Sequence, residues 1–156
     1  MADQESVITD EMRAQIGKES APTTYQVDRT TIRLFARAVG YDDPLYYDED
    51  FAKSKGHRAL PAPPGCFGYP IFDPRKAADL GPGRPQTRLT RVLNGGTEYE
   101  YFDTIYAGDT LVATGRITDI YERTGGMGLM LFTLREQVFK RDGKVVLISR
   151  GTGINY

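Results

Sequence analysis

The sequence predicts an α+β fold in which an antiparallel sheet wraps around one helix. Apolar residues at helical spacing are confined to the first half of the chain, whereas alternating, aromatic runs dominate after Gly83. Asp142-Gly143 separates the last two of these runs and is typical of a two-residue hairpin turn, because both residues tolerate a positive φ. With 156 residues, the chain has the length of one domain, so we expect residues 1–156 to form a single domain.

The composition is that of a soluble globular protein and gives no sign of a nucleic-acid partner. Hydrophobic residues make up 40% of the chain, charged residues 26%, and the net charge is −1. Lysine and arginine form no long basic block. Cys66 and His57 are single residues of their kinds, which excludes an intrachain disulfide and argues against a metal site. No apolar run approaches the ~20 residues of a membrane span and no signal-peptide core opens the chain, so we expect a cytoplasmic protein.

Three elements are expected before residue 40. Residues 6–20 indicate a short helix that ends near Gly17, and residues 22–27 indicate a short strand. Asp28 then begins a helix over 28–39, because its carboxylate can accept hydrogen bonds from the backbone N–H groups of the first turn. Glycine suits the end of a helix, here Gly40. The apolar face of this helix contains Ile32, Phe35, Ala36 and Val39.

Two further helices are expected before the sheet. Residues 48–56 carry acids first and lysines last, which matches the dipole of a short helix. Residues 64–80 are apolar and rich in glycine, and Pro63-Pro64 can open a helix because proline suits the first turn. Pro70 would kink this helix or shorten it.

Four long antiparallel strands are expected after Gly83, with Gly125-Gly126 marking one of the turns between them. A curved antiparallel sheet needs a cover on its inner face. The 64–80 segment is the one long apolar helix available as that cover. A sheet wrapped around a central helix is the hot-dog architecture, which is the predicted fold.

Several segments together carry a resemblance to a known family. They are "DRTTIRLFARAVG" running into "DDPLYYDED", "APPGCFG", "LNGGTEYEYFDTIYAGDTL" and the closing hairpin. The chain resembles the MaoC-like and fatty-acid-synthase-type dehydratases, and in particular their N-terminal hot-dog domain, from Ile16 to Tyr156. This family hydrates 2-enoyl thioesters of CoA or acyl carrier protein, or runs the reverse dehydration. The resemblance implies such a thioester as substrate and no cofactor.

The chain departs from the family at its catalytic loop. In the family, an aspartate and a histidine of a G-D-x-N-P-x-H loop hold the water that adds to the substrate. With the loops aligned on Pro44, Tyr41 takes the aspartate position and Tyr46 the histidine position. A tyrosine hydroxyl titrates near ~10 and is a poor base at neutral pH. Asp42 is displaced by one residue, so its side chain should point elsewhere.

The missing dyad leads to several functional hypotheses. In the leading one, the chain is the substrate-binding subunit of a heteromeric hydratase or dehydratase, and a second hot-dog subunit carries the intact dyad. A second is a self-sufficient homodimer that uses His57 and a nearby carboxylate such as Asp42. A third is a catalytically silent acyl-CoA-binding module, and a fourth a thioesterase, because one fold hosts several chemistries. A neighbouring reading frame that encodes an intact dyad loop would favour the first.

The candidate substrate-binding residues come from three places. Tyr46 and Tyr47 can line the pocket or pack the loop. Gly65 and Cys66 open the expected central helix and can offer backbone N–H groups to a thioester carbonyl, and Gly68 can leave room for an acyl chain. Glycines can also mark close packing, and a small cysteine is usually buried. The last candidates, at the start of the aromatic strand, are Asn94 and Gly95.

Overall fold

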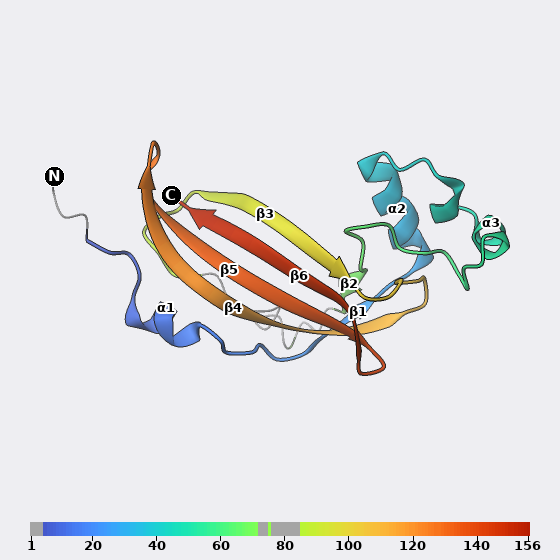
Figure 1. The fold of residues 1–156 in the computed structure, drawn as a ribbon, viewed down its shortest axis with the longest axis horizontal. Helices are drawn as coiled ribbons and strands as arrows, with labels where there is room; N and C mark the ends of the chain where they lie inside the picture. The colour runs from blue at the N-terminus through green and yellow to red at the C-terminus, as the bar shows by residue number, and fades with distance from the viewer. Residues whose placement is uncertain (1–4, 72–74, 76–84) are drawn as a thin grey trace.

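The computed structural model describes residues 5–71, 75 and 85–156. Its main feature is a curled, six-stranded antiparallel sheet in the order β2-β1-β4-β5-β6-β3 (Figure 1). The strands are β1 (Thr23–Gln26), β2 (Tyr69–Pro70), β3 (Val92–Tyr101), β4 (Thr110–Gly125), β5 (Gly128–Arg141) and β6 (Lys144–Asn155). The predicted first short strand and the four long strands are confirmed, as is the hot-dog class of fold.

The turns between the long strands have the predicted chemistry. Asp142 and Gly143 take φ values of 50° and 78° between β5 and β6, as a tight hairpin requires. The β4–β5 hairpin turns at Gly126 and Met127, one residue later than the glycine pair suggests, because Gly125 still pairs with Gly128.

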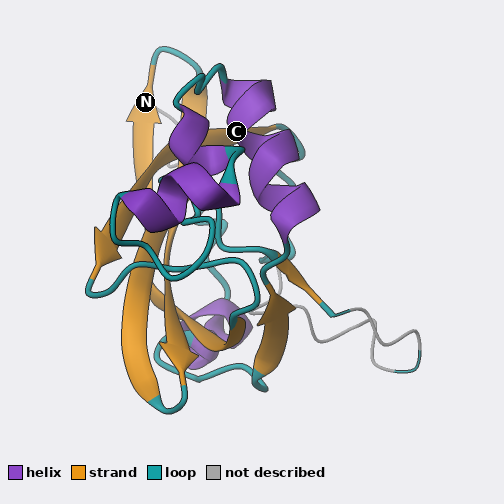
Figure 2. Ribbon diagram, turned by 90° about the vertical axis from the view of Figure 1, so that its right-hand side faces the viewer, coloured by secondary structure: helices purple, strands orange, loops and turns teal. Residues whose placement is uncertain are grey.

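The helices flank the sheet and do not interrupt it: α2 and α3 lie together at one end, and α1 lies beside β4 (Figures 1 and 2). Helix α2 (Arg29–Val39) begins at the predicted cap, where the Asp28 carboxylate accepts from Thr31 N at 2.9 Å, and ends at Gly40 with φ 79°. Helix α3 (Glu49–Ser54) follows a 3₁₀ turn, η1 (Pro44–Tyr46). No helix in the described ranges is long and apolar enough to cross a bilayer.

Helix α1 (Asp10–Gln15) is shorter than the predicted 6–20 segment. The residues before it run along β4, because the Glu122 carboxylate accepts from the backbone N–H groups of Val7 and Ile8. Gly17 follows the helix with φ 81°. Contacts with the sheet therefore replace the first and last residues of the predicted helix.

The predicted central helix at 64–80 is wrong over its described part, residues 64–71 and 75. Gly65 and Gly68 have φ values of 88° and 77°, which a right-handed helix does not allow. Tyr69 and Pro70 form β2 instead, at the sheet edge, where a proline's missing N–H is tolerated. The rest of that segment, 72–74 and 76–80, lies outside the described residues.

Two clusters of buried side chains cover one face of the sheet. At the end near α2, side chains of α2, α3 and the 60–67 segment pack on Leu111, Ala113, Phe139 and Leu147. At the other end, Val7 and Met12 pack on Ile117, Ile120 and Leu131. Leu111, Ala113 and Ile117 alternate along β4 and so share this face.

Candidate functional site

The loop with the altered dyad positions is held by short-range hydrogen bonds. The Asp43 side chain accepts from Leu45 N at 2.9 Å and so caps η1. The Tyr47 hydroxyl donates to Tyr41 O at 2.5 Å. The rings of Tyr41 and Tyr46 lie with their centroids 5.8 Å apart. The fold therefore brings together the two positions where the family has its aspartate and histidine, with a phenol at each.

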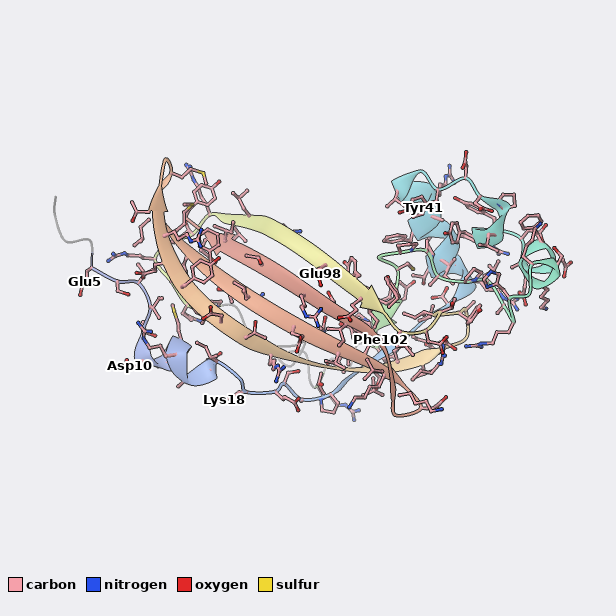
Figure 3. The ribbon with its side chains drawn as sticks, viewed as in Figure 1. Glu5, Asp10, Lys18, Tyr41, Glu98 and Phe102 are labelled. Atoms are coloured by element: carbon pink, nitrogen blue, oxygen red, sulfur yellow. The ribbon has the colours of Figure 1, made fainter. Side chains whose placement is uncertain are left out.

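The two phenols have different surroundings. Tyr41 is exposed (Figure 3), whereas Tyr46 packs against the buried cluster near α2. Burial, with a smaller contribution from the Asp43 charge, raises the pKa of Tyr46 above its ordinary value. Its hydroxyl is therefore an even poorer base at neutral pH than an exposed tyrosine.

The backbone N–H groups at Gly65 and Cys66 already have partners within the chain. Gly65 N donates to the Tyr101 hydroxyl at 2.8 Å, and Cys66 N donates to Pro63 O at 2.9 Å. A thioester carbonyl at Gly65 would have to replace the Tyr101 oxygen. Burial raises the pKa of the Cys66 thiol, so Cys66 has no thiolate character at neutral pH.

Tyr101 connects Gly65 to the altered loop, because it lies next to both Gly65 and Tyr41. Burial raises the pKa of its phenol, the Gly65 N–H opposes that shift, and smaller upward contributions come from its neighbours Tyr99, Cys66 and Tyr41. Tyr101 also lines a cavity of about 490 Å³ with Ala62, Pro64, Phe102, Asp103, Thr104 and Ile105. The contact between Gly65 and Tyr101 therefore lies at the rim of a cavity, next to the altered loop.

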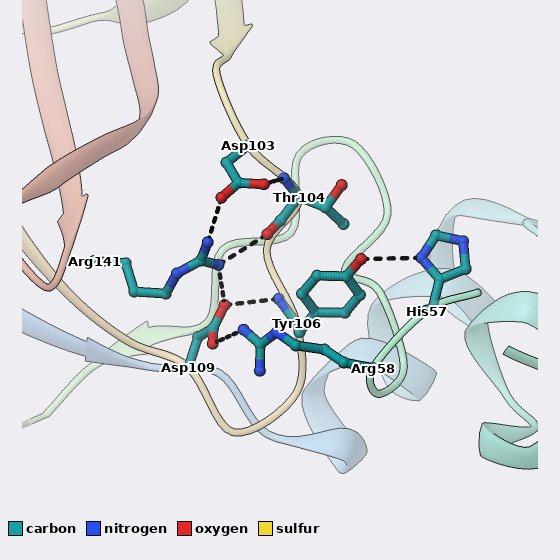
Figure 4. A network of polar contacts seen from close by, with 7 residues as sticks. All are labelled: His57, Arg58, Asp103, Thr104, Tyr106, Asp109 and Arg141. Atoms are coloured by element: carbon teal, nitrogen blue, oxygen red, sulfur yellow. Dashed lines mark hydrogen bonds and ion pairs between the residues drawn. The ribbon is translucent and has the colours of Figure 1, made fainter. Parts of the chain in front are cut away.

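A buried carboxylate, Asp109, holds the end of the loop whose first residues, Asp103 and Thr104, line this cavity (Figure 4). Asp109 is 5% exposed and forms ion pairs with both Arg58 and Arg141. Arg141 also donates to Thr104 O at 2.9 Å and so ties the 103–109 loop to β5. Burial alone would raise the pKa of Asp109. The hydrogen bonds from Arg58, Tyr106 N and Arg141 outweigh this effect and hold the pKa below its ordinary value.

His57 belongs to the polar network around Asp109 and not to a proton-transfer pair. Its Nδ1 lies 3.1 Å from the Tyr106 hydroxyl, and the Arg58 guanidinium stacks 4.4 Å over the Tyr106 ring. The imidazole of His57 therefore has a phenol, and not a carboxylate, as its hydrogen-bond partner. The described residues contain no group of three His, Cys, Asp or Glu side chains that could hold a metal.

The remaining predicted residues lie apart from this cavity or serve packing. Asn94 and Gly95 are at the opposite end of β3 from Tyr101, roughly 20 Å away at the rise of a strand. Asn94 Oδ1 accepts from Gly96 N at 3.0 Å within a bulge, and a Cβ at Gly95 would lie 2.9 Å from the Ile154 side chain. The structure does not bring these two residues to the Gly65 group.

The expectation that Gly68 leaves room for an acyl chain is wrong. A Cβ at Gly68 would lie 2.2 Å from Gln26 O, so the glycine makes room for β1. We expect Gly68→Ala to destabilise the fold by about 2 kcal/mol or more. The added methyl group would collide with Gln26 O, and an alanine is strained at the positive φ of this position. Gly126→Ala is the matched control, since its Cβ would meet nothing within 4 Å. Equal urea midpoints for the two variants would contradict this packing role.

Sequence reasoning missed the residues that shape the cavity. The alternation of Tyr99 and Tyr101 looks like ordinary strand patterning, and only the fold shows that Tyr101 reaches Gly65. Asp109 in "AGDTL" and Arg141 beside the hairpin carry a weak signal, since a charged residue next to buried strand positions usually has a partner.

The curled antiparallel sheet defines the class of fold, which is the hot-dog fold. Residues 14–149 match the family model described as FAS1-like, dehydratase domain region. The chain therefore belongs to the FAS1-like dehydratase family.

Relatives in sequence and in structure agree with this assignment. The chain is 34% identical to a UPF0336 protein of Saccharopolyspora erythraea over 146 residues, which cover 88% of this chain and 90% of that protein. It is 38% identical to the UPF0336 protein SCO4636 of Streptomyces coelicolor over 113 residues, which cover 70% and 73%.

Three solved structures share the fold. The C-terminally truncated HadBC (3R-hydroxyacyl-ACP dehydratase) complex of Mycobacterium tuberculosis matches with a TM-score of 0.67 and 21% identity, over 90% of this chain and 97% of that chain. The ChsH1-ChsH2 complex of the same organism gives 0.67 and 18%, over 88% and 84%. The (R)-hydratase from A. caviae gives 0.58 and 12%, over 88% and 94%.

Proposed function

We propose that this chain is the substrate-binding, dyad-less subunit of a heteromeric acyl-thioester hydratase or 3-hydroxyacyl dehydratase. The substrate is an enoyl or 3-hydroxyacyl thioester of CoA or acyl carrier protein. One observation carries the proposal: the loop keeps the glycine and the proline of the family's pattern at Gly40 and Pro44, yet both dyad positions hold phenols, with ring centroids 5.8 Å apart.

The reaction needs a base for the water and an acid for the α-carbon. The raised pKa of Tyr46 suits it to neither role near neutral pH, and the Tyr106 partner of His57 does not support a His57–Asp42 pair. These observations favour a chain that binds and shapes the acyl site over a self-sufficient homodimer. The same contacts are compatible with a catalytically silent acyl-CoA-binding module, which differs in having no catalytic partner.

The cavity supplies what a substrate-binding subunit needs. Its lining combines the apolar residues Pro64, Phe102 and Ile105 with Tyr101, whose hydroxyl accepts from Gly65 N. Arg141, which pairs with Asp109, also binds the lining residues Asp103 and Thr104, so this side of the cavity is held by contacts within the chain. A carbonyl can occupy the position of the Tyr101 oxygen, because both are acceptors for Gly65 N–H.

A second subunit is part of the proposal. The HadBC and ChsH1-ChsH2 structures are both named as complexes, which supports a heteromeric assembly for a chain with the same fold. The partner would be another hot-dog chain with an intact aspartate and histidine. A copy of this chain would add only a second pair of phenols.

Tyr101→Phe is expected to tighten binding of a 2-enoyl-CoA to this chain by up to about tenfold, because the substrate carbonyl no longer competes with a hydroxyl for Gly65 N–H. Isothermal titration with crotonyl-CoA measures the change. Tyr99→Phe is the matched control, since the Tyr101 hydroxyl is the acceptor that Gly65 uses. Weaker binding by Tyr101→Phe would instead make the hydroxyl itself a substrate contact.

The proposal as a whole is tested by purifying the native complex through a tag on this chain and assaying enoyl-thioester hydration. We expect a second hot-dog chain in the complex and activity that neither chain has alone. A complex without any hydratase or dehydratase activity would favour the silent binding module.

A further inference from the structure

The outer face of the sheet is the side on which no described helix packs. Along β5, Leu131 and Phe139 point into the two buried clusters, so the even-numbered residues between them point to the other side. Ile32 of α2, Ala52 of α3 and Met12 of α1 all belong to those clusters and so lie on the inner side. The four long strands are seen in Figure 1 with no described helix in front of them. The outer face is therefore a broad surface, four strands wide, that is available for a partner.

A row of alternating charges crosses this outer face. Its members are direct neighbours in register on β4, β5, β6 and β3, and they are Arg116, Glu136, Arg150 and Glu98. Arg116 pairs with Glu136 at 2.8 Å. Arg150 pairs with Glu136 and with Glu98 at 3.1 Å each. The row therefore reads positive, negative, positive, negative from β4 to β3.

Apolar side chains flank the charged row on both sides. A second row in register over the same four strands lies nearer the β4–β5 hairpin and consists of Tyr121, Phe132, Ile154 and Leu93. On the other side of the charged row, Val138 pairs with Ile148. All of these apolar side chains remain partly exposed. The outer face therefore offers apolar surface for association and charges that fix the alignment of a partner.

A row of four alternating charges is complementary to its own reverse. A twofold axis parallel to the strands, between β5 and β6, sets β4 against β3 of a second copy and β5 against β6. Arg116 then faces Glu98 of the second copy, and each Glu136 faces an Arg150. A twofold axis along the row would instead set every charge against its own counterpart, which is repulsive. The charges therefore favour the first orientation and oppose the second.

We infer that the outer face binds the outer face of a second copy of this chain, with the twofold axis parallel to the strands. Packed sheets lie ~10 Å apart, a distance that an arginine and a glutamate side chain span together. A cavity of about 540 Å³, lined in part by Glu136, Arg150 and Leu134, leaves room for the facing guanidinium groups. The same axis sets Phe132 against Ile154, so the apolar rows also meet.

The size of this face predicts a weak dimer. Four strands ~4.8 Å apart, over the ten residues of β3 at a rise of ~3.3 Å, give a face on the order of 600 Å² per copy. A partner in an interface of standard size buries about 800 Å². We therefore expect a Kd on the order of 10⁻⁵ M for the wild-type chain.

A charge exchange between two variants tests this arrangement by sedimentation velocity on the full chain. Arg116→Glu opposes two glutamates across the interface and Glu98→Arg opposes two arginines, so each variant alone should dimerise more weakly than the wild-type chain. An equimolar mixture restores opposite charges at both contacts. We expect its mixed dimer to be at least about tenfold tighter than the dimer of either variant. The gain should shrink between about 0.05 M and about 0.5 M salt, because the contact is electrostatic.

Arg37→Glu, in place of Arg116→Glu, is the matched control. It makes the same change in net charge on the exposed side of α2. Its mixture with Glu98→Arg still opposes two arginines at one of the two contacts, so the tenfold gain should be absent. An equal gain in both mixtures would mean that Glu98 acts at the sheet edge or through net charge, and would overturn the inference. A wild-type chain that stays monomeric at about 1 mM would overturn it as well.

Neutral variants cover the case in which a reversed charge disturbs folding. Arg116→Gln and Glu98→Gln each remove the contact between copies without creating repulsion. Within one chain, β5 and β6 separate the two side chains, whereas in the dimer they face each other. Their losses of dimerisation free energy should therefore be less than additive in the double variant, and additive losses would contradict the arrangement. Tyr101 pairs with the buried Leu147 and so points to the inner face, which makes this test independent of the proposed function.

Discussion

The isolated chain is expected to hydrate 2-enoyl-CoA at least about 10²-fold more slowly than its complex with a partner that carries the dyad. General acid or base catalysis by one positioned side chain typically contributes ~10²–10⁴-fold. This chain has phenols at both positions, and burial raises the pKa of the one at Tyr46. Tyr41 is exposed, and its ring lies beside that of Tyr46. Neither side chain replaces the missing groups.

His57→Ala separates this prediction from the homodimer hypothesis. His57 contacts the Tyr106 hydroxyl, so its loss should leave the residual rate of the isolated chain unchanged. The measurement is the initial rate of crotonyl-CoA hydration, followed by absorbance of the enoyl thioester. Robust turnover by the isolated chain that His57→Ala abolishes would contradict the proposed division of labour.

Asp109→Ala is expected to lower the free energy of unfolding by about 3–5 kcal/mol, because it leaves the half-buried guanidinium of Arg141 without its buried partner. Asp109 is 5% exposed, and it also accepts from Tyr106 N at 2.9 Å. Its loss therefore removes a backbone hydrogen bond as well as two ion pairs. Urea unfolding at neutral pH measures the change.

Asp103→Ala is the matched control for this network. Asp103 also pairs with Arg141, but its side chain is 58% exposed, and surface ion pairs contribute about 0–1 kcal/mol. The two variants should therefore differ by at least about 2 kcal/mol. Similar losses for both would mean that Asp109 is not the centre of the network.

Much of the fold is readable in the sequence, because local chemistry sets it. Asp28 and Gly40 bound α2 through a side-chain cap and a left-handed backbone, and Asp142-Gly143 sets the last hairpin. The apolar 64–71 segment misleads for a physical reason. Glycine permits both helical and left-handed backbones, and the sequence does not say that Gly68 must avoid Gln26 O.

The candidate site also has a part that the sequence predicts and a part that only the fold shows. The absence of an aspartate at 41 and a histidine at 46 is visible in one short loop. The contact between Gly65 and Tyr101 joins residues 36 positions apart, and the ion pair of Arg58 and Asp109 joins residues 51 apart. Such pairs depend on how the 58–67 segment meets the end of β3 and the loop that follows it, which no local pattern encodes.

The most direct test of the account measures enoyl-thioester hydration by the reconstituted complex while one subunit at a time is altered. Replacing Tyr41 and Tyr46 by phenylalanine in this chain should leave the maximal rate within about threefold, because neither phenol transfers a proton. Replacing the dyad histidine of the partner should lower that rate by ~10²-fold or more. A loss of that size from the Tyr41→Phe/Tyr46→Phe variant, with the partner's dyad intact, would contradict the claim that this chain binds the substrate and leaves the chemistry to its partner.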